Sequence, residues 1–546
     1  MRRIRARGAI GIGLAVAVVV GAIGGWMVFR PDGGDKEPIV VGSTATPTMV
    51  DPGGAYDAGA WSLMSNLYQS LLTFTPGQEK PVPDAAESCG FTDNELTVFR
   101  CRLRDDLTFS DGDPVTPEDV KFSYDRVLAM AARAEREAGD DSIPEEDKFV
   151  YAGPAALLAS LEAVRIDGRD IVFELNQPDA TFPFIVAGSA GAIVDQDSYE
   201  ELEPRTDGRV VGSGPYLLVG YQEGVLAELE PNPAYRGAAE VPEFPVTVRY
   251  FRQAEDGTPA ERLLAEAWEA GELDVNDGKM PPQMMAEINI SDPDFRFSES
   301  TDGSIRVLAF NTREGAPMAD ETAREVAASL LDREAISRHV QQDTVEPLYS
   351  LIPVGFTGHG TPYYDRYRDR DPDELRDALE SAGLEVPVAF HLAYSRGVAS
   401  NEEADLMERQ LEADGLFEVQ IQYYDWSQFI PTVYGTHPYD AYLVGWSPDF
   451  PDPATFTAAL LGPGDGLNTG YHSDTIDELI ARTQTESDRG RAAEDFRTIH
   501  EHAADEAPII PIWQAKQITI SRSDITGIQH LSTHSGVWRL WELRRI

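Results

Sequence analysis

Asp449 and Trp446 are the residues whose types and spacing most suggest chemistry, and both lie in the segment YDAYLVGWSPDFPDP at 439–453. Residues 441–444 are apolar and predict a short strand, which ends before a turn that sets Asp449 and Asp452 between prolines. A rigid strand end, a flat aromatic wall and a fixed negative charge could together grip the positive end of a small ligand. The same pattern also fits a buried strand that enters a proline turn, with Trp446 as an ordinary core residue.

The sequence lacks the residue combinations that would indicate catalysis. The serine-hydrolase motif G-x-S-x-G is absent, and its nearest match, AGSAG at 187–191, lacks the first glycine. His500 and His502 lie two positions apart in a helical pattern, so they face different sides, and no H-E-x-x-H motif is present. Asp449 and Asp452 could serve as a general acid and base, but acidic residues around a proline turn mostly form local hydrogen bonds. The sequence therefore predicts a binding protein that is not an enzyme, with no metal ligands and no cofactor.

Composition limits both the architecture and the partners. A chain of 546 residues is too long for one simple core, which predicts two or three lobes, and 42% hydrophobic residues are typical of globular proteins. The net charge is −48, from 93 acidic and 45 basic residues. Such a charge repels nucleic acid and anionic lipid, so neither is expected to bind the main body of the chain, whereas cationic ligands are attracted.

The first residues predict a membrane anchor. Several arginines within residues 1–7 form a basic cytoplasmic tail, and the uncharged stretch at 8–29 is long enough to span a bilayer as a helix. Arginines before a span keep its N-terminus inside, so residues after about Arg30 are expected outside the cytoplasm. A cleaved signal peptide is the alternative, but the apolar run is long and has no clear A-x-A site. We expect a single-pass anchor in the cell membrane, followed by a polar Gly/Pro linker at 30–38.

The two cysteines, Cys89 and Cys101, are expected on a hairpin. A turn signal at 92–94 and a strand pattern at 96–103 lie between and around them. A disulfide across the hairpin would contribute about 3 kcal/mol if it were unstrained, and two free thiols are the alternative. Because disulfides form outside the cytoplasm, the predicted location favours the bond.

Helices and strands alternate along the chain, which predicts α/β lobes with mixed sheets. Residues 39–42 read as a buried strand that continues to the turn at 51–52, and leucines at helical spacing predict a helix over 60–72. Further strands are expected at 388–394, 419–423 and 509–513. Further helices are expected over 371–383, from Ser400 onward, and near 475–486 and 489–505.

The segment LRDDLTFSDGDPVTPEDVKFSYDRV at 103–127 contains a strong helix start. Thr116 can cap the helix, Pro117 suits its first position, and acidic residues fill the first turn. By itself this is well-formed local structure. It also resembles the signature of the extracellular solute-binding proteins that serve peptide-type ABC importers, which reads LR-x-G-V-x-F-S-D-G-x-P-L-T-A-E-D-V-x-F-S-x-x-R.

Later segments are similar to the same family, in the same order. GSGPYLLVGY at 212–221 and NPAYRG at 232–237 resemble its GTGPY…N-x-x-Y-x-G stretch. Residues 308–336 resemble its NT…PF-x-D-x-x-V-R stretch, although Met318 stands where an aromatic residue is usual. The segment at 439–453 resembles its G-W-x-A-D-Y-x-D-P motif, so the matches cover nearly the whole chain after the linker.

The resemblance implies a two-lobed α/β clamshell like that of the periplasmic binding proteins, of type II, with an extra domain in lobe one. Lobe one is then expected at 39–80, 205–300 and 510–546, with 81–204 as its appended domain and 301–509 as lobe two. In the family, the lobes close by hinge bending on an extended peptide whose backbone pairs with strand edges. The peptide is passed to an ABC permease, so a peptide and permease subunits are the expected partners of a monomer.

The resemblance also implies which residues hold the peptide. Asp449 matches the position that binds the peptide's ammonium group, which cannot be buried cheaply without a partner. Trp446 matches a pocket wall, and the backbone of Thr44, Ala45 and Thr46 matches the segment that lies against the peptide. Side chains of the peptide enter roomy, water-padded pockets in this family, which tolerate different sequences.

The peptide's carboxylate has one candidate partner. Dipeptide binders of the family use an arginine on the loop after the strand equivalent to 388–394, where this chain has Arg396; a solvent-facing turn arginine is the alternative. Binders of longer peptides place an arginine three residues before the tryptophan, and Leu443 stands there, so that clamp is missing. Ser447 and Pro448 also depart from the family pattern and can alter the loop.

A peptide is therefore the leading ligand, and other ligands stay open. Relatives also carry nickel, haem or sugars, so another cationic or amino-bearing solute or a nickel chelate is an alternative. From a different functional class, a surface peptide sensor or a hydrolase on the same scaffold is the competing hypothesis.

Overall fold

The computed structural model describes residues 36–546 apart from 77–79, 141, 277–279, 369, 396–398, 426–427, 430–432, 434–438 and 533–537. The chain divides into two units, residues 1–38 and 39–546, and the fold described below is that of the second unit. The predicted basic tail, the predicted anchor at 8–29 and most of the predicted linker lie outside the described residues. Within the described part, no helix is both long enough and apolar enough to cross a membrane.

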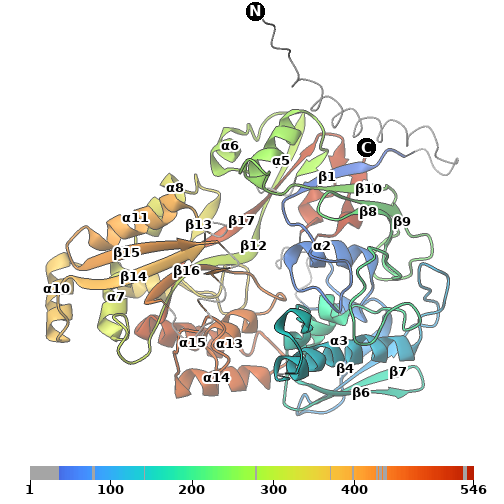
Figure 1. Cartoon of the computed structure of the whole chain (residues 1–546), viewed down its shortest axis with the longest axis horizontal. Helices are drawn as coiled ribbons and strands as arrows, with labels where there is room; N and C mark the ends of the chain where they lie inside the picture. The colour runs from blue at the N-terminus through green and yellow to red at the C-terminus, as the bar shows by residue number, and fades with distance from the viewer. Residues whose placement is uncertain are drawn as a thin grey trace, which may run out of the picture. The chain divides into compact units, whose positions relative to one another are not determined.

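An eleven-stranded mixed sheet forms the frame of residues 39–546 (Figure 1). From one edge to the other its strands are β15 (Phe417–Tyr424), β14 (Val388–Ser395), β16 (Ala441–Trp446), β12 (Phe295–Phe310), β17 (Ile509–Arg522), β11 (Val275–Asn276), β1 (Ile39–Ser43), β10 (Val246–Tyr250), β9 (Leu226–Pro231) and β8 (Tyr216–Gln222). The remaining strand, β13 (Val345–Pro347), pairs with β17.

The long antiparallel strands β12 and β17 pass from one half of this sheet to the other. Residues 295–301 of β12 pair with 516–522 of β17, which pairs there with β11 as well. Residues 305–309 of β12 pair with 509–514 of β17 and, on their other side, with β16. An irregularity between Thr301 and Ile305 separates the two stretches. One sheet therefore continues through both domains.

In the C-terminal domain, helices cover both faces of the sheet because alternate residues of a strand point to opposite sides. Leu308 and Phe310 of β12 enter one core, and Val307 and Ala309 enter another. The first core packs against α7 (Glu321–Leu330), α8 (Arg333–His339), α9 (Pro362–Tyr367), α10 (Pro372–Ser381) and α11 (Asn401–Glu412). The second packs against α13 (Ala454–Leu461), α14 (Asp474–Gln484) and α15 (Ala493–Glu506).

The N-terminal domain has a main core and a smaller one. Helix α2 (Ala58–Leu67) packs with β1, β8, β9, β10 and residues 525–543 in the main core. Helices α5 (Ala260–Glu269) and α6 (Pro282–Glu287) pack against β17 in the smaller core. Short two-stranded pairs complete the domain: β2 (Leu72–Thr73) with β3 (Val82–Pro83), and β18 (Ile525–Thr526) with β19 (Arg544–Arg545).

A separate antiparallel sheet lies between residues 86 and 175, with helices α3 (Pro117–Ala138) and α4 (Phe182–Ala187) packed in its core. Its strands are, in spatial order, β4 (Ala86–Phe91), β5 (Val98–Leu103), β7 (Asp170–Leu175) and β6 (Leu161–Asp167). Thr116 caps α3 in a capping box, so the predicted helix start is confirmed. Cys89 and Cys101 face each other across β4 and β5 and form a disulfide.

Several predicted boundaries are wrong. The helix expected over 60–72 begins at Ala58 and ends at Leu67, and the first strand ends at Ser43 instead of continuing to 51–52. The strand expected at 509–513 continues to Arg522, because β17 finds a partner in β12 along its whole length. The last long helix begins at Ala493, four residues later than expected.

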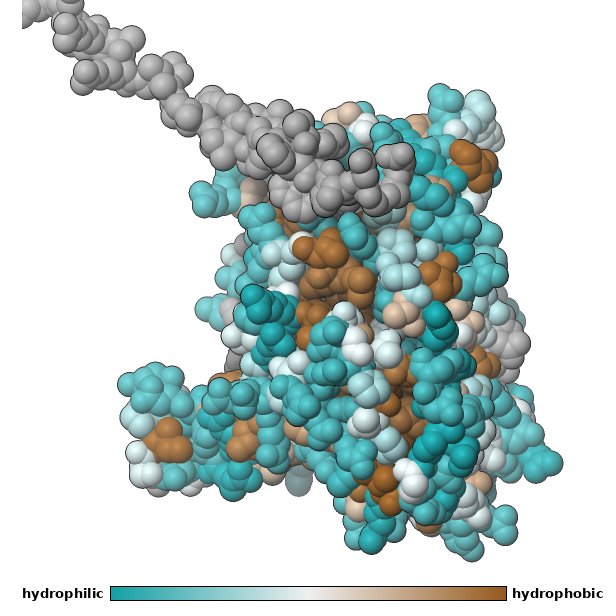
Figure 2. Space-filling model, turned by 90° about the vertical axis from the view of Figure 1, so that its right-hand side faces the viewer, coloured by the Kyte–Doolittle hydropathy of each residue, from teal (hydrophilic) through white to brown (hydrophobic). Residues whose placement is uncertain are grey.

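The surface of residues 39–546 is mainly hydrophilic on the face drawn in Figure 2, where hydrophobic residues gather in smaller patches. Large hydrophobic side chains that are exposed, such as Val150, Val219 and Ile290, are scattered along the chain. Single exposed residues of this kind are normal for globular proteins and do not by themselves mark a docking surface.

Candidate functional site

The loop at 447–453, which follows β16, is held to helix α13 through Thr455. The indole Nε1 of Trp446, the last residue of β16, donates to the carbonyl oxygen of Thr455 at 2.8 Å. The backbone N–H of Asp449 donates to the Thr455 hydroxyl at 3.1 Å. Trp446 is half-buried and packs against the core that α13 covers, so the ring and the loop share one fixed support.

A buried ion pair fixes the other end of this loop. Asp452 is 1% exposed, and its two carboxylate oxygens accept from Nε and Nη2 of Arg489, each at 2.7 Å. Nη1 of Arg489 donates to the carbonyl oxygen of Thr483 in α14, and Oδ1 of Asp452 accepts from the N–H of Ala454 at the start of α13. Asp452 therefore ties the loop to two helices, which gives it a structural role.

Asp449 extends from the same loop to the N-terminal domain. Its Oδ1 accepts a hydrogen bond from the phenol of Tyr56 at 2.5 Å. Burial raises the pKa of Asp449, against the lowering effect of hydrogen bonds from Tyr56 and Thr455. Burial and then the charge of Asp449 raise the pKa of Tyr56, so its phenol is neutral at physiological pH. Burial disfavours the charged form of Asp449, so a positively charged ligand group beside it would stabilise the carboxylate.

The sequence around Tyr56 explains how its ring reaches Asp449. Gly59 lets α2 start against the preceding chain, because a Cβ at that position would stand 2.6 Å from the carbonyl carbon of Thr46. Asp57 caps α2 with its side chain, which fixes the direction in which the helix leaves. Trp61, one turn into α2, meets Tyr56 edge to face, with ring centroids 4.9 Å apart. The connection from β1 to α2 therefore presents Tyr56 on a rigid base.

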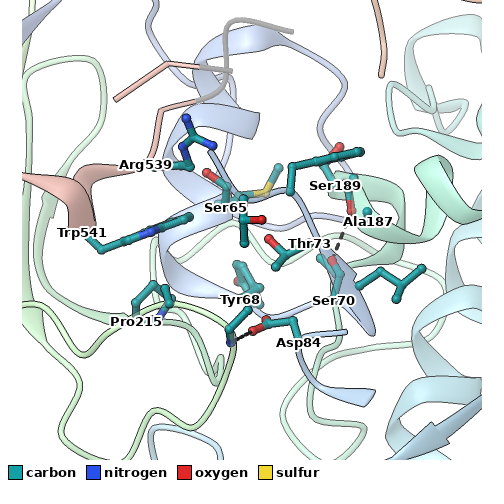
Figure 3. Close-up of a pocket in the computed structure, with 18 of the residues that line it drawn as sticks. Ser65, Tyr68, Ser70, Thr73, Asp84, Ala187, Ser189, Pro215, Arg539 and Trp541 are labelled. Carbon is teal, nitrogen blue, oxygen red and sulfur yellow. Dashed lines mark hydrogen bonds between the residues drawn. The ribbon is translucent and has the colours of Figure 1, made fainter. Parts of the chain in front are cut away.

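A cavity of about 260 Å³ lies against α2, and Asp449 reaches its wall from the C-terminal domain. The lining includes five aromatic side chains: Trp61, Tyr68, Phe74, Tyr235 and Trp541. Figure 3 shows the cavity with Arg539 and Trp541 on one side, Ala187 and Ser189 on the opposite side, and Tyr68 and Thr73 between them. Two domains thus contribute to one partly enclosed site whose lining includes several aromatic rings.

The predicted site residues differ in how they relate to this cavity. Asp449 lines the cavity, whereas neither Trp446 nor residues 44–46 belong to the described residues that line it. Arg396 lies outside the described residues, so its role stays a prediction. Leu443, which stands where longer-peptide binders have an arginine, is fully buried and pairs with Leu308 of β12.

Sequence reasoning missed Tyr56, Arg489 and the aromatic cavity. Tyr56 lies 393 positions from Asp449, and Arg489 lies 37 positions from Asp452, so no local pattern links either pair. The one available signal was Asp57, an aspartate placed before an apolar helical stretch, which marks the helix start beside Tyr56.

The described residues offer no metal site, in that no group of three or more His, Cys, Asp or Glu is placed to hold an ion. His500 and Ser350 are in contact, with 3.1 Å between Nδ1 and the hydroxyl oxygen, and both are buried. Burial lowers the pKa of His500 to about 3, so the ring is neutral at physiological pH. This pair is part of the core of the C-terminal domain and not of the cavity.

Comparison with known proteins gives consistent matches. A family model described as "Bacterial extracellular solute-binding proteins, family 5 Middle" matches residues 80–468. The periplasmic murein peptide-binding protein MppA of Escherichia coli is 23% identical over 501 residues, which cover 88% of this chain and 88% of that protein. The di/tripeptide-binding protein 2 of Pseudomonas aeruginosa is 24% identical over 522 residues, covering 90% of this chain and 92% of the relative.

A solved structure confirms the predicted architecture. The periplasmic binding protein DppA from Helicobacter pylori, in complex with the peptide STSA, superposes with a TM-score of 0.74 at 19% identity. The alignment covers 93% of this chain and 98% of that one. At this level of identity the likeness establishes the fold, and the predicted two-domain α/β architecture of periplasmic binding proteins is confirmed.

Proposed function

The chain belongs to the bacterial extracellular solute-binding proteins of family 5, and we propose that it captures di- or oligopeptides between its two domains and delivers them to an ABC importer. Relatives described as binding peptides match it along about nine-tenths of its length. The protein itself performs no chemistry in this proposal, since hydrolysis of ATP belongs to the importer's other subunits.

The observation that carries the proposal is the environment of Asp449. This carboxylate is partly buried, its pKa is raised by burial, and Tyr56 supplies it with a neutral donor. A peptide's ammonium group would compensate the charge, and Asp449 would spare that group the several kcal/mol that an unpaired buried charge costs. Tyr56 can take part too, because a phenol oxygen can accept from an ammonium group while its hydrogen points to the carboxylate.

Further contacts with the peptide are assigned by family resemblance. Trp446 would form a pocket wall, and the backbone of Thr44, Ala45 and Thr46 would pair with the extended peptide, as in β-augmentation. Arg396 would hold the peptide's carboxylate. The fixed position of Trp446 on Thr455 supports the role of that side chain as a wall.

The family is extracellular, so the body of the chain lies outside the cytoplasm, and the finer arrangement is proposed. Residues 8–29 would anchor a monomer in the cell membrane by a single span. Residues 39–80, 205–300 and 510–546 would form lobe one, with 81–204 as its appended domain and 301–509 as lobe two. Separate hydrophobic cores support the division in outline, although the core of lobe two takes in Ile510 and Ile512 and the main core of lobe one takes in Val194 and Tyr199.

Replacing the carboxylate tests the proposal. In the full-length protein purified in detergent, Asp449→Asn is expected to weaken binding of a tripeptide by about 2–5 kcal/mol, because one partner of a buried charge pair is removed. Isothermal titration calorimetry measures the loss, and N-acetylation of the peptide is expected to reproduce it on the wild-type protein.

Tyr56→Phe is the companion variant: it removes the hydrogen bond to Asp449 and keeps the charge, so it is expected to weaken binding less than Asp449→Asn does. Unchanged affinity in Asp449→Asn would refute the ammonium assignment. Mass spectrometry of the ligand that co-purifies with the wild-type protein distinguishes a peptide from another amino-bearing solute.

A further inference from the structure

The cavity against α2 is lined by Asp449, the proposed ammonium site, whereas Trp446 and residues 44–46 do not belong to the described lining. Its walls come from α2, residues 70–76, residues 187–192, the loop at 235–240 and residues 539–542. All of these segments belong to the N-terminal domain. Among the described lining residues, Asp449 comes from the C-terminal domain. In Figure 3 the labelled side chains surround a common space.

Several polar groups of this cavity are bonded to the protein, whereas the indole N–H of Trp61 and the hydroxyl of Ser189 have no hydrogen-bond partner among the described residues. Oδ1 of Asp84 accepts from the phenol of Tyr235 at 3.0 Å, and its Oδ2 accepts from the amide of Gln69 at 3.1 Å. Nε and Nη2 of Arg539 donate to the carbonyl oxygens of His530 and Ser532. The apolar surface that remains for a ligand comes from the aromatic rings together with Met64, Leu72 and the prolines and alanines of the lining.

The hydroxyl of Tyr68, another residue of the lining, is also bonded to the protein. The hydroxyl of Tyr68 donates to the carbonyl oxygen of Val50 at 3.0 Å and contacts the hydroxyl of Tyr199 at 2.7 Å. Its ring, and not its hydroxyl, is thus the part available to a ligand. Rings at these positions favour other aromatic groups, which pair edge to face or offset with them.

The size of the cavity fits one side chain. A cavity of about 150 Å³ lined by apolar side chains is large enough to hold benzene, and this one measures about 260 Å³. Pockets for whole drug-sized ligands are about 300–1,000 Å³, so a complete peptide does not fit. The side chain of one phenylalanine or tryptophan fits into this volume.

The position of Asp449 determines which side chain of a bound peptide would enter the cavity. If its carboxylate holds the peptide's ammonium group, the first residue's Cβ is two bonds from the bound nitrogen. We propose, on the basis of the proposed function, that this cavity receives the first side chain of the peptide and selects large apolar ones, aromatic ones above all. Among the described lining residues, one is basic, Arg539, and four are acidic, Asp84, Glu240, Asp449 and Glu542, so the net negative charge disfavours an acidic side chain there.

Peptides that differ in their first residue test this inference on the full-length protein. Phe-Ala-Ala is expected to bind about 10- to 100-fold more tightly than Ala-Ala-Ala, which corresponds to the burial of one large apolar side chain. Glu-Ala-Ala is expected to bind more weakly than Ala-Ala-Ala. Equal affinities for Phe-Ala-Ala and Ala-Ala-Ala would overturn the inference and leave the proposed function intact.

Filling the cavity separates the side-chain site from the ammonium site. Thr73→Phe, in β2, is expected to remove the preference for Phe-Ala-Ala and to leave the affinity for Ala-Ala-Ala within about threefold. Asp449→Asn is the contrasting variant, because it should weaken both peptides by a similar factor. Ala239→Phe fills the cavity from a loop and replaces Thr73→Phe if that variant does not fold. A preference that persists in the filled variant contradicts the inference, and wild-type protein that binds none of the peptides contradicts the proposed function as well.

Discussion

At the scale of single residues, Asp449 combines its proposed role in binding with a cost to the stability of the fold. Burial raises its pKa above the ordinary value of 3.8, so the ligand-free folded protein holds the proton more tightly than the unfolded chain does. The free energy of unfolding therefore falls as the pH rises through the interval between the two pKa values, and the penalty is complete above it. An ammonium group bound to Asp449 would offset that penalty.

The direction of this pH dependence predicts how Asp449→Asn changes the stability of the protein in the absence of ligand. At about pH 7 the variant is expected to be more stable than the wild-type protein, and the difference should shrink as the pH falls toward about 4. Urea unfolding at several pH values, followed by circular dichroism, measures it. Asp488→Asn, at an exposed position in the chain, serves as the control and should show no such trend. A variant less stable than the wild type at neutral pH would contradict the argument.

Single residues also mark how far the sequence could predict the candidate site. Asp449 and Trp446 could be singled out because they lie in one short segment with a recognisable spacing. Tyr56 could not, because its contact with Asp449 depends on the approach of two domains. The aromatic cavity was even harder to predict from the sequence, because its walls come from segments that are far apart in the chain, from Trp61 to Trp541.

At the scale of elements, the loop at 447–453 depends on the turn between α14 and α15. Arg489 lies in that turn, and its guanidinium binds both oxygens of the buried Asp452. We expect Arg489→Met to lower the free energy of unfolding by about 3–5 kcal/mol, because Asp452 would be left as a buried charge without its partner. Chemical denaturation measures the change.

The neighbouring Arg491 provides the control for Arg489→Met. Its side chain is 76% exposed and its contact with Asp488 is long, at 3.8 Å. Arg491→Met should therefore change stability by less than about 0.5 kcal/mol. Peptide binding should weaken in Arg489→Met, since the loop that carries Asp449 loses its anchor, and should be retained in Arg491→Met. Equal effects of the two variants would show that the buried pair is not what holds the loop.

Elements with local signals were predicted well, and elements that depend on distant partners were not. The helix after Thr116 and the helix after Ser400 begin where their capping residues place them. The sixteen-residue strand β12 was missed, and only the first part of β17 was predicted. These two strands pair mainly with each other, across more than 200 positions of sequence, so neither carries a short-range signature of its length.

At the scale of the molecule, the sheet explains how two domains can be distinct and still coupled. Strands β12 and β17 run through both halves, and their pairing is irregular between Thr301 and Ile305. The domain cores lie on either side of this irregularity. The alternation of strands and helices predicted an α/β fold, but it could not reveal one continuous sheet, because continuity depends on long-range pairing.

Charge is the property of the whole molecule with the clearest consequence for stability. A net charge of −48 makes the folded chain repel itself, and unfolding relieves the repulsion by moving the charges apart. Salt screens this repulsion, since the Debye length falls from about 30 Å at 0.01 M to about 3 Å at 1 M. We therefore expect the unfolding temperature to rise by several degrees over this range of sodium chloride, as measured by differential scanning calorimetry. Sucrose at matched osmolality is the control for exclusion effects that do not involve charge. An unfolding temperature that stays constant or falls with salt would mean that the attraction within exposed ion pairs, which salt also screens, outweighs the net repulsion.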